Sequence, residues 1–440
     1  MRNMRILFFI SIGILLLGAS CSKGGLENIP VEQAFEEPAV ALARYVEKLQ
    51  EPAAGWEFGL VGKQAGFYAG YLDFDQENTA RFTVATLAPG NPGLEETVFH
   101  TGVAGTNPVL VFPSGAFARF ALSQDGVDTS FTFQAIRSDT IFLLGNQHGS
   151  ELKLTKASPD KAEAYRGTGM LDVIAAMENL QRLPKYFKRL TVNGATYDLH
   201  FRPDMKSVYI HYGGTERFAI HETLYSLTAT GIYLRQPLID GINRIDYIDD
   251  FSVDASGTTM TAWVGGQPAE FTNEAEPAAY DTTAILTFYN NPTYQLISRL
   301  EDNTEVVQRY SVSLDALTVA GETDAYGFGE IAGYQFMVFF HQWVGADFGL
   351  FRLAINTDAG NEVSSYGLAF KPHFSTSNGV IGFEFYGTLG AFPADAMPAF
   401  EQFAIAIANP YGYYAVRSGA ASFDLVSRDI SQGQKWIRFE

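Results

Sequence analysis

Short runs of alternating apolar and polar residues fill most of the chain, and clusters of turn-forming residues separate them. Alternation with a period of two is typical of strands that bury one face. In the first third of the chain, the connections between these runs have the length of hairpin loops. This favours an antiparallel meander, and thus an up-and-down, lipocalin-like barrel. The predicted strands of this region are residues 68–74, 81–87, 109–112, 117–122, 131–136, 141–144 and 151–155.

Two amphipathic helices interrupt this pattern, and each precedes a group of strands. Pro38 suits the first position of a helix over residues 38–50. Ser158 suits the N-cap of the second helix, which is expected to end before Pro184. Their apolar faces are Leu42, Val46 and Leu49 in the first helix and Met170, Val173, Ile174, Met177 and Leu180 in the second.

The rest of the chain extends the same plan of a helix followed by strands. Strands are expected over residues 188–265, and the last third contains further strand-like runs. Residues 400–407 favour a helix, although residues 403–408 also alternate as a strand would. The expected domains are residues 38–157 and 158–440, and a division of the second near residues 274–280 stays open. The predicted fold class is mainly β, with antiparallel lipocalin-like barrel or sandwich domains, each preceded by an amphipathic helix.

The chain begins with a basic, an apolar and a small-residue segment in that order, which is typical of a secretory signal peptide. Residues 6–17 are almost wholly apolar but too few to span a bilayer comfortably. Small residues then lead into Cys21, in an order that resembles the lipobox of bacterial lipoproteins. We expect a lipoprotein signal peptide over residues 1–20, lipidation of Cys21 and a tether over residues 21–37. The alternative is an ordinary signal peptide with an incidental cysteine.

Charge and composition narrow the classes of function. The formal net charge of −19 repels phosphate backbones and anionic lipid surfaces. Nucleic acid is therefore excluded as a partner, and membrane contact is expected only through the lipid. Because Cys21 is the single cysteine, an exported body contains no disulfide and no cysteine-based zinc site, and packing must stabilise it. Aromatic residues make up 14% of the chain, which fits a β-sheet protein.

The best cluster of chemically active side chains falls on one predicted hairpin, with its turn at residues 203–206. In that register Asp198 lies opposite His211 and His200 lies opposite Tyr209, so the four side chains share one face. Two imidazoles and a carboxylate there could hold a divalent metal. We expect instead a solvated polar face without metal, since an amphipathic hairpin needs one. The opposite, buried face would contain Leu199, Phe201, Val208 and Ile210.

Familiar catalytic motifs are missing from the sequence, which contains no P-loop, His-Glu-x-x-His or Gly-x-Ser-x-Gly. The acidic groups Glu36–Glu37 and Asp246–Asp250 contain residues of the type that a glycosidase uses. The second group also suits calcium, although it lacks the spacing of a known calcium loop. His341 follows an apolar run and is expected to be a buried histidine with satisfied hydrogen bonds. No cofactor and no metal are expected.

The segment Asn409-Pro-Tyr-Gly-Tyr-Tyr is predicted to form a turn that exposes Tyr411, Tyr413 and Tyr414. Exposed flat rings stack on sugar rings or on peptide side chains, so these three tyrosines are the predicted ligand-binding residues. The alternative is that they fill a core, as most aromatic residues of this chain must.

Several segments together resemble a family of Bacteroidota lipoproteins catalogued as a domain of unknown function, and the resemblance covers nearly the whole chain. These segments are the lipobox, the helix that leads into Gly55-Trp56, and residues 107–112, 139–145, 149–154 and 434–439. Genes of this family tend to lie beside SusC/SusD-type outer-membrane importers and a zinc metallohydrolase lipoprotein. The resemblance therefore implies an outer-membrane lipoprotein in nutrient uptake, and it supplies no catalytic or ligand residues.

Three functions stay open at this stage. The first is a non-catalytic accessory lipoprotein that binds oligopeptide or glycan for a SusC/SusD-type importer, which the lack of catalytic motifs favours. The second is a surface polymer hydrolase, either a glycosidase or a metallohydrolase. The third is a structural component of the envelope. Residues 22–25 lack the acidic residues that often follow the cysteine of surface-exported Bacteroidota lipoproteins, so the periplasmic and the cell-surface side both stay open.

Overall fold

The structure is a computed structural model, and it describes residues 36–440 apart from a few short stretches. The stretches left out are residues 65, 86–92, 214–217, 254–259, 300–304, 314–317, 320–323, 325, 344–346, 358–359 and 432. The predicted signal peptide, Cys21 and nearly all of the predicted tether lie outside the described residues.

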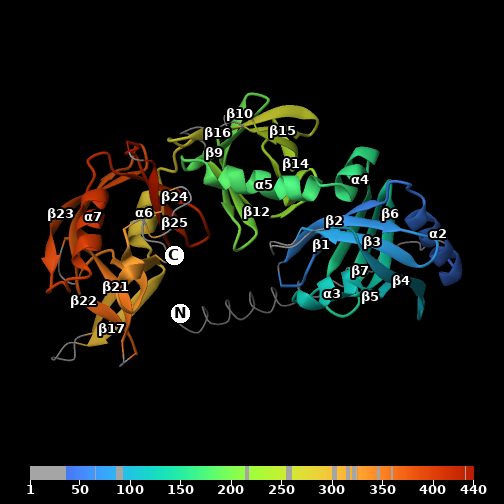
Figure 1. Ribbon diagram of the computed structural model, residues 1–440, viewed down its shortest axis with the longest axis horizontal. Coiled ribbons are helices and arrows are strands. Elements are labelled where there is room, and N and C mark those ends of the chain that lie inside the picture. The colour runs from blue at the N-terminus through green and yellow to red at the C-terminus, as the bar shows by residue number, and fades with distance from the viewer. Residues whose placement is uncertain are drawn as a thin grey trace, which may run out of the picture.

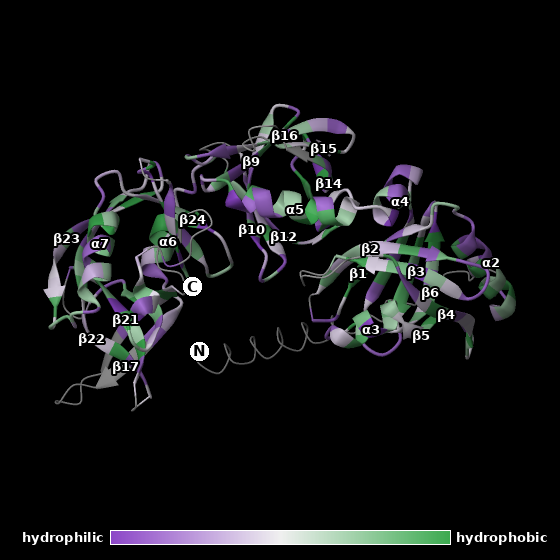
Figure 2. Cartoon of the chain, viewed as in Figure 1, coloured by the Kyte–Doolittle hydropathy of each residue, from purple (hydrophilic) through white to green (hydrophobic). Residues whose placement is uncertain are grey.

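Three antiparallel β units follow one another in chain order (Figure 1). The first eight strands close into one barrel and the next eight into a second barrel, and the remaining ten form a single sheet. The prediction of a mainly β protein with antiparallel barrels, each preceded by a helix, is confirmed. Figure 2 shows hydrophobic and hydrophilic residues alternating along many strands, as elements with one buried face require.

The first barrel is an up-and-down meander in which β1 pairs with β2 on one side and with β8 on the other. Along β1, Trp56, Phe58 and Leu60 enter the barrel core, so Glu57 and Gly59 face outward. The strands are β1 (Trp56–Val61), β2 (Phe67–Phe74), β3 (Thr79–Val84), β4 (Glu95–Ala104), β5 (Asn107–Gly115), β6 (Ser130–Arg137), β7 (Thr140–Gly145) and β8 (Glu151–Lys156).

Helix α2 (Pro38–Gln50) covers this barrel and confirms the predicted helix over residues 38–50. Its fully buried residues are Ala41, Tyr45 and Leu49, whereas Leu42 and Val46 are only partly buried. The buried face is therefore rotated by about one residue from the predicted one. The reason is Tyr45, whose ring stacks on Phe133 at 4.4 Å between centroids and fixes the contact line.

The strand predicted over residues 117–122 is wrong, because this segment forms helix α3 (Ala116–Ser123). Phe117, Phe120 and Ala121 are buried and follow helical spacing, while Leu122 is exposed. Gly115 has a φ of 91°, and a Cβ atom there would lie 2.5 Å from the Cα of Thr97. Glycine thus lets the chain leave β5 in a direction from which the helix can begin.

The second barrel follows helices α4 (Pro159–Arg166) and α5 (Gly169–Arg182), and β9 closes it against β16. The Ser158 side chain accepts a hydrogen bond from the backbone nitrogen of Lys161, which confirms the predicted N-cap. The strands are β9 (Phe187–Val192), β10 (Ala195–Arg202), β11 (Ser207–Tyr212), β12 (Ala219–Leu227), β13 (Gly231–Ile239), β14 (Arg244–Val253), β15 (Met260–Val264) and β16 (Gln267–Glu274).

The third sheet encloses a core to which helices α6 (Ala284–Asn290) and α7 (Met397–Ile407) contribute side chains. Helix α7 confirms the helix predicted near residues 400–407. Val312 and Glu440 exchange both backbone hydrogen bonds, at 3.1 and 2.9 Å, so the end of β26 lies against β18 and the sheet curls round. Its order is β17-β18-β20-β21-β22-β23-β24-β25-β26-β19.

The elements of this unit are β17 (Tyr294–Arg299), β18 (Glu305–Ser313), β19 (Thr318–Val319), the 3-10 helix η2 (Phe328–Glu330), β20 (Tyr334–Phe340), β21 (Gly349–Thr357), β22 (Gly360–Ser375), β23 (Val380–Leu389), β24 (Tyr413–Arg417), β25 (Phe423–Ser427) and β26 (Lys435–Phe439). Within the described part of the chain, no helix combines the length and the apolar character needed to cross a bilayer.

A buried ion pair within the third sheet is linked by a hydrogen bond to the segment that precedes the second barrel. Asp424 is fully buried and receives two hydrogen bonds from the guanidinium of Arg438, at 2.8 and 2.9 Å. Tyr186, which lies between α5 and β9, donates its hydroxyl to the same carboxylate at 2.6 Å. Burial alone would raise the pKa of Asp424, but Arg438 and these hydrogen bonds hold it below its usual value.

Candidate functional site

The best candidate site is a cleft between the two barrels, which we call the interbarrel cleft. It has a volume of about 480 Å³. Pockets of this size occur preferentially at domain joints and are typical of small-molecule sites. Its lining residues are Gly59, Val61, Phe67, Gln134, Phe142, Leu143, Leu144, Glu151, Leu152, Lys153, Tyr233, Arg235 and Gln236.

Strand β1 meets strand β13 at the base of this cleft. Gly59 faces outward from the first barrel, and a Cβ atom there would lie 3.2 Å from Cε1 of Tyr233. A larger side chain at position 59 would therefore press on the tyrosine ring. The absence of a side chain on Gly59 lets the ring of the second barrel approach the wall of the first.

The Tyr233 ring is held in one orientation. It stacks on Tyr247 with 4.2 Å between centroids and an interplanar angle of 5°. Its edge meets Phe67 at 5.3 Å, and the Lys153 ammonium donates to its hydroxyl at 3.4 Å. A ring fixed in this way loses little rotamer freedom when a flat ligand stacks on it.

The rim of the cleft is polar and locally cationic. The amides of Gln134 and Gln236 are exposed, and so is the guanidinium of Arg235. Neither a hydrogen bond nor an ion pair is recorded for the Arg235 side chain among the described residues, so its donors are available. The two positive charges of Lys153 and Arg235 exceed the one negative charge of Glu151, whereas the whole chain has a net charge of −19. A fixed ring beside exposed amide and guanidinium donors can bind flat polar ligands.

The three tyrosines predicted as the ligand site lie in different environments. Tyr411 is 59% exposed, as expected, but Tyr413 and Tyr414 are only 1% and 4% exposed. The prediction that all three are exposed is therefore wrong for Tyr413 and Tyr414. Both begin strand β24, where successive side chains point to opposite faces. One face packs into the core of the third sheet and the other against the second barrel, so neither ring reaches solvent.

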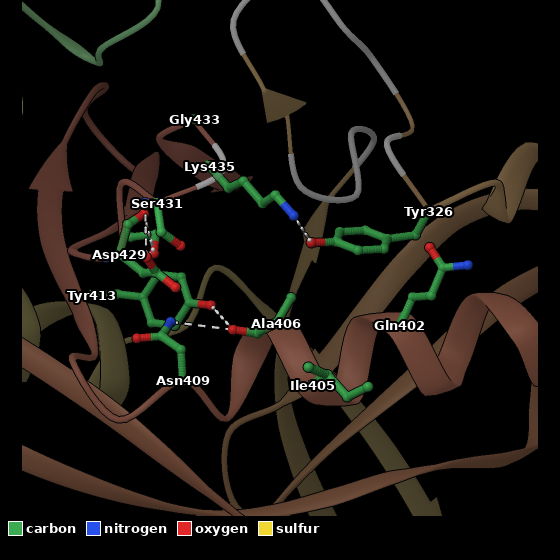
Figure 3. Close-up of a pocket in the computed structure, with 11 residues that line it drawn as sticks. Tyr326, Gln402, Ile405, Ala406, Asn409, Tyr413, Asp429, Ser431, Gly433 and Lys435 are labelled. Atoms are coloured by element: carbon green, nitrogen blue, oxygen red, sulfur yellow. Dashed lines mark hydrogen bonds between the residues drawn. The ribbon is translucent and has the colours of Figure 1, made fainter.

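Tyr413 nevertheless lines a second cavity of about 300 Å³, which Figure 3 shows. Its hydroxyl donates to the carbonyl oxygen of Ala406 at 2.5 Å, and burial raises the pKa of that hydroxyl. On the other side, the Lys435 ammonium donates to the Tyr326 hydroxyl at 2.9 Å. Most of the polar groups labelled in Figure 3 form hydrogen bonds with one another. The cavity lined by Tyr413 therefore offers fewer free polar groups than the interbarrel cleft.

The histidine hairpin has the predicted register but not the predicted solvation. Asp198 pairs with His211 and His200 with Tyr209 across β10 and β11, as expected. The four side chains are only 1–6% exposed, so the expectation of a wet face is wrong. Residues of the third sheet cover them: His211 Nε2 lies 2.8 Å from the carbonyl oxygen of Arg417. On the opposite face, Leu199, Val208 and Ile210 lie in the core of the second barrel, as predicted.

The other candidate ligands are engaged in structural contacts. His341 is buried, with Nε2 2.9 Å from the Ser311 hydroxyl and Nδ1 3.2 Å from the carbonyl of Tyr289, which confirms its predicted role. Asp246 pairs with Arg244 at 3.1 Å. Among the described residues, no three His, Cys, Asp or Glu side chains are placed to share a metal ion.

Sequence reasoning missed the residues of the interbarrel cleft. Tyr233 and Phe67 have the ordinary spacing of strand residues, and nothing in their neighbourhood distinguishes them from core aromatics. Gly59 gives the one usable signal, because glycine inside a strand often marks the close approach of another chain segment.

The fold and the cleft define a β-rich protein in which residues of two barrels line one of the clefts. Residues 39–249 match the family described as Domain of unknown function (DUF4302), so the chain contains a DUF4302 domain from α2 into β14. All lining residues of the interbarrel cleft fall inside this match. No curated protein matches the chain.

Two solved structures show a weak likeness to this chain. The octameric penicillin-binding protein homologue from Pyrococcus abyssi aligns with 40% of this chain at 11% identity and a TM-score of 0.15. This chain spans only 33% of that protein. The Helicobacter pylori beta clamp bound to a DNA ligase peptide aligns with 91% of this chain and 97% of its own, at 9% identity and a TM-score of 0.14. Scores this low carry no argument about fold or function.

Proposed function

We propose that this protein is a non-catalytic binding protein that captures an oligopeptide or a glycan in the interbarrel cleft. The observation that carries the proposal is the cleft itself, in which a fixed Tyr233 ring lies beside exposed amide and guanidinium groups. The ring provides a stacking surface, while Gln134 and Gln236 provide donors and acceptors. Sugar rings and peptide segments both require this combination.

We also propose that a lipid on Cys21 anchors the protein to the outer membrane, where it serves a SusC/SusD-type importer. The basic, apolar and small-residue order of residues 1–20 supports the anchor. The importer rests on the family resemblance alone, which is an analogy rather than a physical argument.

The Cys21→Ala variant is expected to lose its lipid and to leave the membrane. Alanine has no thiol to carry diacylglycerol, and two or more acyl chains are what make such an anchor firm. Labelling with radioactive palmitate and fractionation of the cells measure both effects. Retention of the variant in the membrane fraction after a carbonate wash would show that the anchor lies elsewhere.

The Tyr233→Ala variant is expected to bind its ligand about 5- to 150-fold more weakly. Stacking on one aromatic ring contributes about 1–3 kcal/mol in protein–nucleic acid complexes, and a sugar or peptide group on Tyr233 belongs to the same range. Arrays of peptides and glycans identify a ligand first, and calorimetry then gives the affinity of wild-type protein and variant.

The matched control is Tyr386→Ala, which removes a ring that is 56% exposed on the third sheet, away from the cleft. This control is expected to bind like wild type. A loss of affinity in Tyr411→Ala, with none in Tyr233→Ala, would show that the ligand binds at Tyr411 and not in the interbarrel cleft. Product analysis runs alongside, because cleavage of the ligand by wild-type protein would contradict the binding-only function and favour the hydrolase.

A further inference from the structure

A third cavity, of about 230 Å³, lies where the end of α5 and strands β9 and β10 face strand β26 of the third sheet. We call it the Lys188 cavity. Its lining includes Lys188, His200, Arg438, Tyr186 and Trp436. It shares no lining residue with the interbarrel cleft.

Lys188 is a buried ammonium without a counter-ion. Its Nζ donates to the carbonyl oxygens of Leu183, at 2.9 Å, and of Lys185. An ammonium has three donors, so one is left over. Among the described residues, no carboxylate forms an ion pair with Lys188, although acidic residues greatly outnumber basic ones in this chain. Burial lowers the pKa of Lys188 to about 7, which is the cost of leaving this charge uncompensated.

His200, which also lines this cavity, carries a second unused polar atom. The residue is only 6% exposed, and its Nε2 atom has no hydrogen-bond partner among the described residues. Burial, followed by the nearby charges of His211, Arg438 and Lys188, keeps the pKa of His200 well below its usual value. The ring is therefore neutral, and the tautomer with a proton on Nε2 has one hydrogen bond left to donate.

The remaining walls define the ligand that would fit. Arg438 lines the cavity, but both of its strong hydrogen bonds go to Asp424, which compensates its charge. Among the charged groups that line the cavity, only the positive charge of Lys188 is uncompensated. A monoanion therefore matches the cavity better than phosphate does. Tyr186 and Trp436 supply apolar wall, which suits a short hydrocarbon tail.

We propose that the Lys188 cavity binds a small aliphatic monocarboxylate, whose carboxylate accepts hydrogen bonds from Lys188 Nζ and His200 Nε2. The carboxylate supplies the missing counter-ion and satisfies the unpartnered imidazole in one step. This site is independent of the peptide or glycan site proposed above, and it predicts a second ligand class for the protein.

Calorimetric titration of the purified chain with sodium butyrate tests this site. Wild-type protein is expected to bind butyrate at a ratio of one to one, and the Lys188→Met and His200→Phe variants are each expected to bind it at least tenfold more weakly. Lys371→Met is the matched control, because that lysine lies on the surface of the third sheet and pairs with Asp347. It is expected to bind butyrate like wild type.

A second measurement uses only wild-type protein, so it does not depend on the folding of a variant. Acetic anhydride acetylates neutral amines, and peptide mass mapping reads the extent at each lysine. Butyrate is expected to slow the acetylation of Lys188 several-fold and to leave Lys371 unchanged. Undetectable butyrate binding by wild-type protein, equal binding by Lys188→Met, or stronger binding of inorganic phosphate than of butyrate would each overturn the proposal.

Discussion

Replacement of Asp424 by alanine is expected to destabilise the protein by about 3–5 kcal/mol, the usual cost of removing one partner of a buried ion pair. The variant leaves the guanidinium of Arg438 largely buried without its carboxylate. It also removes the acceptor to which the hydroxyls of Tyr186 and Ser418 donate. Tyr186 belongs to the segment before the second barrel, so the junction between barrel and sheet weakens together with the sheet. Urea denaturation followed by circular dichroism measures the change.

The matched control for this variant is Asp347→Ala. Asp347 also pairs with a basic residue, Lys371, at 3.2 Å, but 78% of its side chain is exposed. Exposed pairs contribute about 0–1 kcal/mol, so the control is expected to unfold close to wild type. Equal urea midpoints for the two variants would show that the Asp424 pair does not stabilise the protein as its burial suggests.

Replacement of Lys188 by methionine is expected to change the pH dependence of stability. Burial lowers the pKa of this lysine from 10.5 to about 7, and unfolding restores the higher value. Between pH 7 and 10 the unfolded chain therefore binds one proton that the folded chain does not. The stability of wild-type protein consequently rises with pH in this window through Lys188, whereas the variant lacks that contribution. Below pH 7 Lys188 is protonated in both the folded and the unfolded chain, so its contribution to stability no longer changes with pH.

The quantity to measure is the difference in unfolding free energy between wild type and Lys188→Met. One proton corresponds to about 1.4 kcal/mol per pH unit, so the difference should move by about 3 kcal/mol in favour of wild type from pH 7 to 9.5. Lys371→Met is again the control and should show no such change. A difference that stays constant over this range would mean that Lys188 remains protonated in the folded protein.

Local patterns in the sequence were sufficient to predict most of the secondary structure. Alternation located six of the eight strands of the first barrel but missed β1 and β4, and helical spacing located α5 and α7. These patterns follow from the geometry of a single element. The register of the hairpin that carries His200 and His211 also followed from the position of its turn. The segment 117–122 was missed because short apolar runs fit helix and strand equally well.

The sites were harder to predict, because they depend on which elements meet. No pattern near Tyr414 or His200 in the sequence indicates that contact between the second barrel and the third sheet buries both residues. Tyr233 gains its role only when strand β13 faces strand β1, which lies more than a hundred residues earlier. Contacts of this kind leave no local pattern.

The closure of the two barrels has a consequence for self-association. A closed barrel pairs every strand on both sides, so it offers no row of free backbone groups to another chain. Among the described strands, the outermost positions belong to the third sheet, at β17 and β19. Strand β19 is only two residues long, which leaves β17 as the longer edge. If partly folded molecules of this protein aggregate, intermolecular strand pairing is therefore expected to begin at β17 rather than in either barrel.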